Sequence, residues 1–399
     1  MTEIPPPPNQ PVYLDNQATT RCDPRVLQAM LPFFSEHYGN PHSVEHAMGR
    51  TAEAAVEAAR GEVAALVGAE LREIIFTSGA TEANNIAIKG AARFAAAMGN
   101  PRRRVITSAS EHKCVLEAVA DLAAEGFDPV VLPVRPDGLL DPETLRQALL
   151  TPTLLVSIMA VNNETGVIQD IAALAPIIKH AGALLHSDLA QAAGKIRLDV
   201  AGWELDLASI SGHKIYGPKG VGALYLRRRP RVRLAPLFSG GGQERGLRSG
   251  TLPTPLIVGF GEAARLAGTE MTPDADRIGR LRADLLDRLR RDVPGLRVNG
   301  SVGARIAGNL NLTFPTATAL DLMAALPDLC VSTGSACSSA AVEPSYVLRA
   351  MGLSDQQAQR SLRIGIGRFT SAAEIDYAAA ALSAAHAACA AGHPVATQS

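Results

Sequence analysis

Lys214, Asp188 and His112 have side chains whose chemistry fits an aldehyde cofactor, and each follows a short apolar run. A lysine packed among small residues, as in the glycine-rich segment 211–220, can lose enough basicity to form a Schiff base with an aldehyde. A buried carboxylate needs a cationic partner, and a protonated pyridine nitrogen would supply one while keeping the ring an electron sink. His112 is a candidate to stack on such a ring and move protons. The competing interpretations are a solvated surface lysine and a helix N-cap at Asp188 before Leu189.

A turn of small residues, Thr77 to Thr81, connects an apolar run to a helical pattern. Backbone N–H groups and the helix dipole at such a helix start favour an anion. The spacing matches neither G-x-G-x-x-G nor a Walker A loop, so a simple tight connection is the alternative. Together with the lysine, the carboxylate and the histidine, the turn predicts a site for a phosphorylated aldehyde.

Cys337 and Arg363 are candidates for acting on the substrate. Cys337 lies in the Ser- and Gly-rich segment 331–340, where a thiol is accessible and mobile enough to reach a substrate atom and carry it away. Cys330, in an apolar run, fits the usual buried and inert thiol. Arg363 lies inside an apolar, strand-like piece, and its planar fork matches a carboxylate. An internal salt bridge is the alternative for this arginine.

The elements that must position these residues alternate between strand-like and helical patterns from about residue 73 to 227. This alternation predicts βαβ units and a largely parallel sheet, in which ligands bind beyond the carboxyl ends of the strands. The expected helices are Thr81–Ala97, Lys113–Ala124 and Ile171–Ala181. The expected strands are Ile74–Thr77, Arg104–Ser108, Val130–Val134, Leu154–Val161, Ala183–His186, Leu207–Ile210 and Ala223–Leu226.

A change of pattern near residue 262 predicts a second, smaller α+β domain. It begins with a helix of mixed charge, 274–292, and continues with the short strands 297–299, 309–314 and 362–366. We therefore expect three parts. They are residues 1–20 as an N-terminal tail and a segment joining the small domain, 21–261 as a large cofactor-binding domain, and 262–399 as a small domain carrying the Cys337 loop.

Composition indicates a globular enzyme of the cytoplasm. The chain has 399 residues, 47% hydrophobic and 19% charged, with a net charge of -1. This charge argues against nucleic acid or an acidic membrane as a partner, because both favour a basic surface. Five cysteines without a C-x-x-C pair predict neither a disulfide framework nor a zinc site, and fit a reducing compartment. We expect no signal peptide and no membrane span.

These segments resemble the NifS/IscS-type cysteine desulfurases of the class V aminotransferase group over nearly the whole chain. The resemblance implies a fold-type I enzyme, with a mostly parallel seven-stranded sheet in the large domain and a smaller α+β domain. It also implies a homodimer with sites at the subunit interface and pyridoxal phosphate bound to Lys214. The matching motifs are residues 13–20, 77–85, 111–113, 161–170, 211–220, 240–251, 335–351 and 363–370.

The resemblance also implies roles for individual residues. His112 would stack on the cofactor ring, Asp188 would pair with its nitrogen, and Gln191 would hydrogen-bond its phenolic oxygen. Asn163 would contact both cofactor and substrate, and with Arg363 would bind the substrate carboxylate. The phosphate would be held by Ala80, Thr81, Ser211 and His213, with Thr251 from the partner subunit.

The implied reaction removes sulfur from L-cysteine, giving alanine and a persulfide on Cys337. The persulfide would pass to an iron-sulfur scaffold or another acceptor protein, where Cys337 would transiently contact iron of a nascent cluster. The segment 343–349 resembles the mobile-loop branch of the family. Leu189 and Ala160 depart from the usual motifs without removing a functional group.

Two alternatives to this function stay open, and the sequence does not name the sulfur acceptor. One is another reaction on the same scaffold, such as an aminotransferase or a selenocysteine lyase. The other is a catalytically silent module that recruits a scaffold protein.

Overall fold

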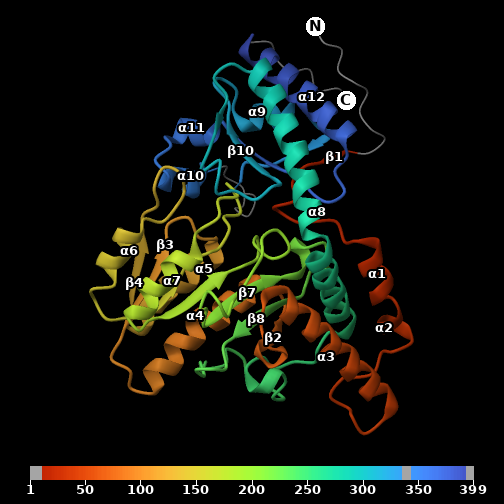
Figure 1. Ribbon diagram of the computed structural model, residues 1–399, viewed down its shortest axis with the longest axis vertical. Coiled ribbons are helices and arrows are strands. Elements are labelled where there is room, and N and C mark those ends of the chain that lie inside the picture. Colours follow the sequence, from red (N-terminus) through yellow and green to blue (C-terminus); the bar gives the residue numbers. More distant parts are fainter. Residues whose placement is uncertain (1–10, 335–342, 392–399) are drawn as a thin grey trace.

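A seven-stranded sheet forms the centre of the larger part of the protein (Figure 1). The structure is a computed structural model, and it describes residues 11–334 and 343–391. The strand order is β2-β8-β7-β6-β5-β3-β4, and within this sheet β8 alone runs antiparallel to its neighbours. The prediction of a mostly parallel seven-stranded sheet is therefore confirmed. The strands are β2 (Ile74–Thr77), β3 (Arg104–Ser108), β4 (Asp128–Leu132), β5 (Thr153–Ser157), β6 (Leu184–Asp188), β7 (Leu207–Ser211) and β8 (Gly222–Leu226).

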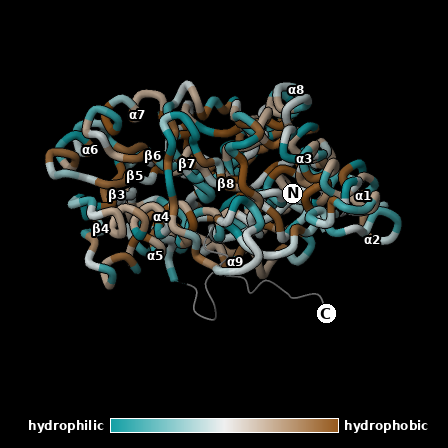
Figure 2. Tube along the Cα trace, turned by 90° about the horizontal axis from the view of Figure 1, so that it is seen from below, coloured by the Kyte–Doolittle hydropathy of each residue, from teal (hydrophilic) through white to brown (hydrophobic). Residues whose placement is uncertain are grey.

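Helices cover both faces of the sheet, which explains why its inner strands are apolar along their whole length. Ile75 on β2 packs toward α4 (Ala80–Ala97) and α5 (Lys113–Asp121). Its neighbour Ile74 faces the opposite core, which contains α7 (Ile171–His180). Figure 2 shows α7 on one side of the strands and α4 and α5 on the other, with apolar residues gathered between them. Both cores hold the strand ends in place.

A smaller sheet, in the order β12-β10-β9, forms the centre of the second part. Its core also contains Val12 and Leu14, because β1 (Val12–Tyr13) pairs with β11 (Leu329–Cys330). The N-terminal segment therefore belongs structurally with the end of the chain. The other elements here are β9 (Arg297–Val298), β10 (Asn309–Thr313), β12 (Ser361–Gly365), α9 (Ala319–Ala324), α10 (Tyr346–Ala350), α11 (Asp355–Gln359) and α12 (Ala372–Ala390).

One continuous helix, α8 (Thr254–Asp292), connects the two parts (Figure 1). Ala267 lies in the core of the large sheet, and Ile278 lies in the core of the small one. The helix predicted at 274–292 was only its second half. The missed half contains Gly261, where a Cβ would lie 2.5 Å from Ala59 Cα, so the glycine allows α3 and α8 to pack closely. The proposed boundary between 261 and 262 falls inside this helix and stays a prediction.

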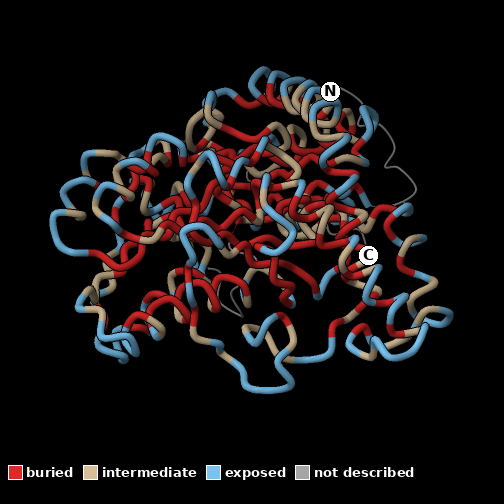
Figure 3. The backbone as a smooth tube through the Cα atoms, turned by 60° about the horizontal axis from the view of Figure 1, so that its bottom comes forward, coloured by how far each residue is buried: buried red, intermediate tan, exposed pale blue. Residues whose placement is uncertain are grey.

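Figure 3 shows exposed residues mostly at the periphery of the molecule and buried residues in its interior. Within the part of the chain that the structure describes, no helix is both long and apolar enough to cross a membrane. The helices not yet named are α1 (Pro24–Met30), α2 (Pro32–Ser35), α3 (Ala47–Val67), α6 (Pro142–Ala148), and the 3-10 helices η1 (Leu71–Glu73), η2 (Leu122–Glu125), η3 (Gly212–Lys214) and η4 (Glu244–Gly246).

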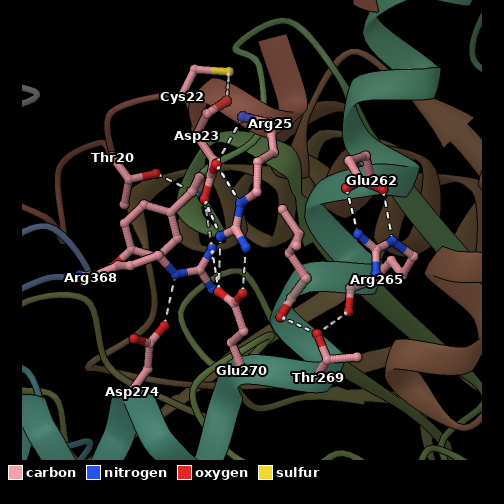
Figure 4. A network of polar contacts seen from close by, with 12 residues as sticks. Thr20, Cys22, Asp23, Arg25, Glu262, Arg265, Thr269, Glu270, Asp274 and Arg368 are labelled. Atoms are coloured by element: carbon pink, nitrogen blue, oxygen red, sulfur yellow. Dashed lines mark hydrogen bonds and ion pairs between the residues drawn. The ribbon is translucent and has the colours of Figure 1, made fainter. Parts of the chain in front are cut away.

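A network of charged side chains, centred on the buried Arg368 and Asp23, joins α1, α8 and the segment after β12 (Figure 4). Arg368 donates to Asp274 Oδ2 at 2.7 Å and to Asp23 Oδ2 at 3.1 Å. Asp23 caps α1 and also binds Arg25, which reaches Glu270 on α8. The hydrogen bond from Arg25 lowers the pKa of Asp23 from 3.8 to about 2. This network fixes the two parts of the protein against each other next to the strand ends.

Candidate active site

A cleft of about 590 Å³ lies beyond the carboxyl ends of the strands, where the two parts of the protein meet. Thr251 is exposed on the loop before α8 and is not among the lining residues of its own chain. Cys337 lies outside the described residues. The remaining predicted site residues all line this cleft, namely Ala80, Thr81, His112, Asn163, Asp188, Gln191, Ser211, His213, Lys214 and Arg363.

Lys214 ends the 3-10 helix η3 directly after β7. Its Nζ atom donates to the backbone carbonyls of Gln17 and Ala18, at 2.6 Å each. The side chain is partly buried, so this placement argues against the solvated surface lysine considered from the sequence. The Gln17 and Ala18 carbonyls hold the amine at the edge of the cleft, where an aldehyde would meet it.

Asp188 is the last residue of β6 and is 4% exposed. One oxygen accepts from Asn84 Nδ2 at 2.8 Å, and the other accepts from the backbone N–H of Ala190 at 2.8 Å. Turns rather than a helix follow at 190–195, so the N-cap interpretation is wrong. Both donors are neutral, and a buried carboxylate is stabilised most by a cation. A protonated ring nitrogen in the cleft would supply that charge.

His112 caps the N-terminus of α5 at the wall of the cleft. Its Nδ1 atom accepts from the backbone N–H of Cys114 at 3.2 Å, so in the neutral ring the proton lies on Nε2. Burial lowers the pKa of His112, against the opposing charge of Asp188. Burial also raises the pKa of Cys114 to about 12, so this neighbouring thiol, 3.0 Å from Nδ1, stays protonated. The histidine is thus a neutral base near pH 7.

The expected phosphate site consists of a turn, the start of α4 and a neutral histidine. Gly79 precedes the helix with a φ of 155°, a conformation that other residues rarely adopt. Ala80 and Thr81 form the first turn of α4, where backbone N–H groups have no partner within the helix. His213 Nδ1 lies 3.0 Å from Thr19 Oγ1, and burial lowers the pKa of His213 to about 4. The arrangement suits an anion.

Arg363 lies on β12 of the small sheet and lines the same cleft as Lys214. Its Nη2 atom donates to Asp15 Oδ1 at 2.8 Å, and its Nη1 atom donates to the Asn163 carbonyl at 3.0 Å. The internal salt bridge considered from the sequence therefore exists, with Asp15 as its partner. Among the described residues, Arg363 Nε and Asn163 Oδ1 are buried without a hydrogen-bond partner. A bound carboxylate would satisfy Nε.

Taken together, these residues fit pyridoxal phosphate. The cleft offers an amine for the aldehyde, a helix start for the phosphate and a buried carboxylate for the ring nitrogen. Unpartnered polar atoms at Asn163 and Arg363 lie where an amino-acid substrate would be held. No cluster of three or more metal-binding side chains occurs within residues 11–334 and 343–391. The predicted contact of Cys337 with iron lies outside those residues.

Several residues around the site escaped prediction from the sequence. Asn84 and Cys114 contact Asp188 and His112, and Asp15 pairs with Arg363. Spacing gave a weak signal for Cys114, which lies two residues after His112. Asn84 and Asp15 gave none, because their contacts join segments far apart in the sequence.

Comparison with known proteins places the chain in a family. Residues 12–378 match the model of the aminotransferase class-V family. The chain is 54% identical over 368 residues to a protein named cysteine desulfurase IscS from Rickettsia bellii, covering 92% of this chain and 89% of that protein.

Solved structures agree with this assignment. A NifS-like protein superposes with a TM-score of 0.86 at 37% identity, covering 95% of this chain and 99% of that one. A structure described as SspA in complex with cysteine superposes with a TM-score of 0.79 at 36% identity, over 90% of this chain and 99% of that one. The chain therefore belongs to the aminotransferase class-V family and, within it, to the cysteine desulfurases.

Proposed function

We propose that this protein is a cysteine desulfurase that binds pyridoxal phosphate on Lys214. It converts L-cysteine into L-alanine and leaves the sulfur as a persulfide on Cys337. One observation carries the proposal: Lys214, Asp188 and Arg363 line a single cleft, an amine and a carboxylate for the cofactor and a cation for the substrate. The name of the Rickettsia relative supports this reaction over transamination.

Different residues of the chain would bind different parts of the cofactor. When bound, pyridoxal phosphate supplies an electron sink that stabilises negative charge on the substrate's Cα atom. Asp188 would pair with the ring nitrogen, and His112 would stack on the ring. Gln191 would donate from Nε2 to the phenolic oxygen. The phosphate would be held by Ala80, Thr81, Ser211 and His213, and by Thr251 of a second copy in a homodimer.

Residues of the same cleft also bind and convert the substrate. Arg363 and Asn163 hold the carboxylate of cysteine, which orients its Cα–H bond toward the lysine. Lys214 Nζ and His112 Nε2 move protons, which suits the neutral state of the buried imidazole. The Cys337 thiolate then attacks the substrate sulfur, so that one C–S bond breaks and one S–S bond forms.

An acceptor protein takes the persulfide sulfur in this proposal. The IscS name of the relatives favours an iron-sulfur scaffold, with transient contact between Cys337 and iron. We place the protein in the cytoplasm, which fits the free thiols of Cys22, Cys114, Cys330 and Cys389 among the described residues.

The test combines spectroscopy with product analysis. Purified protein should show a visible cofactor band that changes when cysteine is added, with alanine and sulfide formed in the presence of a thiol reductant. Cys337→Ala should keep the cofactor band and lose persulfide formation and sulfide release. Cys330→Ala is the matched control, because Cys330 lies on β11 and does not line the cleft.

Three outcomes contradict the proposal in different ways. Undiminished sulfide release by Cys337→Ala removes this cysteine from the reaction. A cofactor band with a keto acid instead of alanine moves the function to another class V reaction. The absence of a band in protein refolded with pyridoxal phosphate removes Lys214 from its role.

A further inference from the structure

A second lysine, Lys195, lies behind the cleft next to the residues that hold Lys214. It is partly buried in the turn after β6, and its Nζ atom donates to Gln191 Oε1 at 2.9 Å. Lys195 and Lys214 also line the same small cavity of about 40 Å³, between the large sheet and the second half of α8. This space holds water at most. Lys195 is absent from the cleft lining, so it acts on the site through other residues.

A chain of hydrogen bonds connects the two lysines. Gln191 Nε2 donates to the Gln17 carbonyl at 2.8 Å, and the same carbonyl accepts from Lys214 Nζ at 2.6 Å. An ammonium group only donates and a backbone carbonyl only accepts. The Gln191 amide therefore has one orientation, with its oxygen toward Lys195 and its nitrogen toward Gln17.

We propose that Lys195 is a positioning residue that fixes the Gln191 amide as a hydrogen-bond donor toward the cleft. This inference rests on the proposed function, in which Gln191 Nε2 faces the phenolic oxygen of the cofactor. Without Lys195, the amide oxygen loses its donor and the Gln17 carbonyl alone fixes the amide, so turned-over conformers, which present the oxygen to the cofactor, become populated. The same carbonyl orients Lys214, so the effect extends to the amine that carries the cofactor.

Electrostatics supports a shared environment for the two lysines. Burial lowers the pKa of Lys195 from 10.5 to about 7, and the charge of Lys214 contributes to the shift. Because an amine donates N–H bonds whether it is charged or neutral, the contact with Gln191 Oε1 persists on either side of that pKa. The neighbouring Gln17 Oε1 atom is buried without a partner among the described residues and lines the same cavity.

The experiment compares Lys195→Met with Lys195→Arg and with a matched lysine variant. Methionine keeps the length of the side chain and removes its N–H donors, whereas arginine keeps a donor. Lys89→Met is the control, because Lys89 is also partly buried but pairs with Asp121 outside the cleft. The first readout is the neutron crystal structure of each variant without cofactor, because X-ray maps do not distinguish an amide oxygen from its nitrogen. We expect the turned-over Gln191 amide to be populated in Lys195→Met only.

The second readout is the cofactor itself. In Lys195→Met we expect pyridoxal phosphate to bind about 10-fold more weakly, the scale of one charge-assisted hydrogen bond, with a shifted visible band. Lys195→Arg should restore both, and Lys89→Met should match the unaltered protein. If Lys195→Met does not fold, Lys195→Gln, whose neutral amide donates more weakly, should show about a three-fold loss.

Two results separate this inference from the proposed function. Unchanged Gln191 orientation, band and affinity in Lys195→Met overturn the positioning role while the function stands. The absence of any cofactor band in the unaltered protein overturns the proposed function, whatever the orientation of Gln191.

Discussion

Arg363 Nη2 lies 2.8 Å from Asp15 Oδ1, so a carboxylate of the N-terminal segment holds the arginine at the wall of the cleft. The backbone places them together, because Asp15 forms a bridge with Gly365 beside β12. The pair leaves Arg363 Nε without a partner among the described residues. Asp15 thus orients the guanidinium without using all of its five N–H donors, which leaves the Nε–H and others for a substrate.

Replacing this arginine should weaken substrate binding and should also lower stability, because Asp15 loses its ion-pair partner. We expect Arg363→Gln to raise KM for cysteine by about 30-fold to 100-fold, because a charge-assisted hydrogen bond to the substrate carboxylate is lost. Steady-state kinetics with cysteine measures this change. An unaltered KM would show that Arg363 pairs with Asp15 but does not bind the substrate carboxylate.

Arg368, five residues further on, provides the matched control. It does not line the cleft and instead binds Asp23 and Asp274 in the network of Figure 4. Arg368→Gln should leave KM nearly unchanged and lower stability by about 3 kcal/mol, since breaking a buried ion pair leaves charges uncompensated. Both variants should lose stability in urea unfolding, and the KM for cysteine separates them, because only Arg363→Gln should raise it.

Asp188→Asn tests the carboxylate proposed for the ring nitrogen. The variant should still bind cofactor, because the phosphate and lysine sites are intact. We expect kcat to fall by about 100-fold or more, the scale of removing one preorganised electrostatic group. Product assays under saturating cofactor measure the fall. Asp199→Asn is the control, because the Asp199 side chain is exposed, accepts from the Gly202 N–H and does not line the cleft. A nearly normal kcat in Asp188→Asn would remove Asp188 from the site.

The sequence predicted the large sheet well because its strands are continuous apolar runs with both faces buried. The run from Leu154 to Val161 shows the limit of that signal. The strand β5 ends at Ser157, but residues 158–161 stay buried as the chain turns toward the cleft, so hydrophobicity continues after strand pairing stops. Similarly, α8 was missed before residue 274, because Gly259, Gly261 and Gly268 weaken its helical pattern. The first two of these glycines permit close packing against neighbouring segments.

The cleft residues from the large sheet were predictable because they lie at or after the ends of strands, and parallel strands bring their carboxyl ends to one edge. Arg363, inside β12, was predicted instead from its charge within an apolar run. Contacts behind the cleft were not predictable in the same way. Lys195 lies four residues after Gln191 outside any helix, so periodicity could not indicate their contact. The partner of Arg363 depends on how β1 and β12 meet, which local pattern does not encode.

Burial of His186 should make the free energy of unfolding depend on pH in a range above that in which carboxylates titrate. Burial lowers its pKa from 6.5 to about 3, with hydroxyls of Ser157 and Ser209 at its ring nitrogens. The unfolded chain takes up a proton as pH falls below 6.5, while the folded chain does not. The contribution of His186 to stability is therefore fully present above pH 6.5. The free energy of unfolding falls by about 2 kcal/mol as the pH is lowered from 7 to 5.

Urea unfolding midpoints at pH 7 and pH 5 measure this decline. His186→Gln should show a decline smaller by that amount, whatever its stability at pH 7. His180→Gln is the control, because His180 is exposed at the end of α7. Equal declines in the unaltered protein and in His186→Gln would mean that His186 is protonated in the fold.

Asp23 should contribute stability that is lost in acid. The hydrogen bond from Arg25 lowers the pKa of Asp23 from 3.8 to about 2, so the folded state favours the ionised form. This contribution is fully present above about pH 5, where it amounts to about 2 kcal/mol, and is lost as pH falls through 2. Asp23→Asn should therefore be less stable than the unaltered protein at pH 5, and the difference should shrink toward pH 2. Asp128→Asn, which removes only the exposed pair with Arg104, should cost under about 1 kcal/mol at pH 5. A constant difference for Asp23→Asn would show that packing, not charge, makes this residue stabilising.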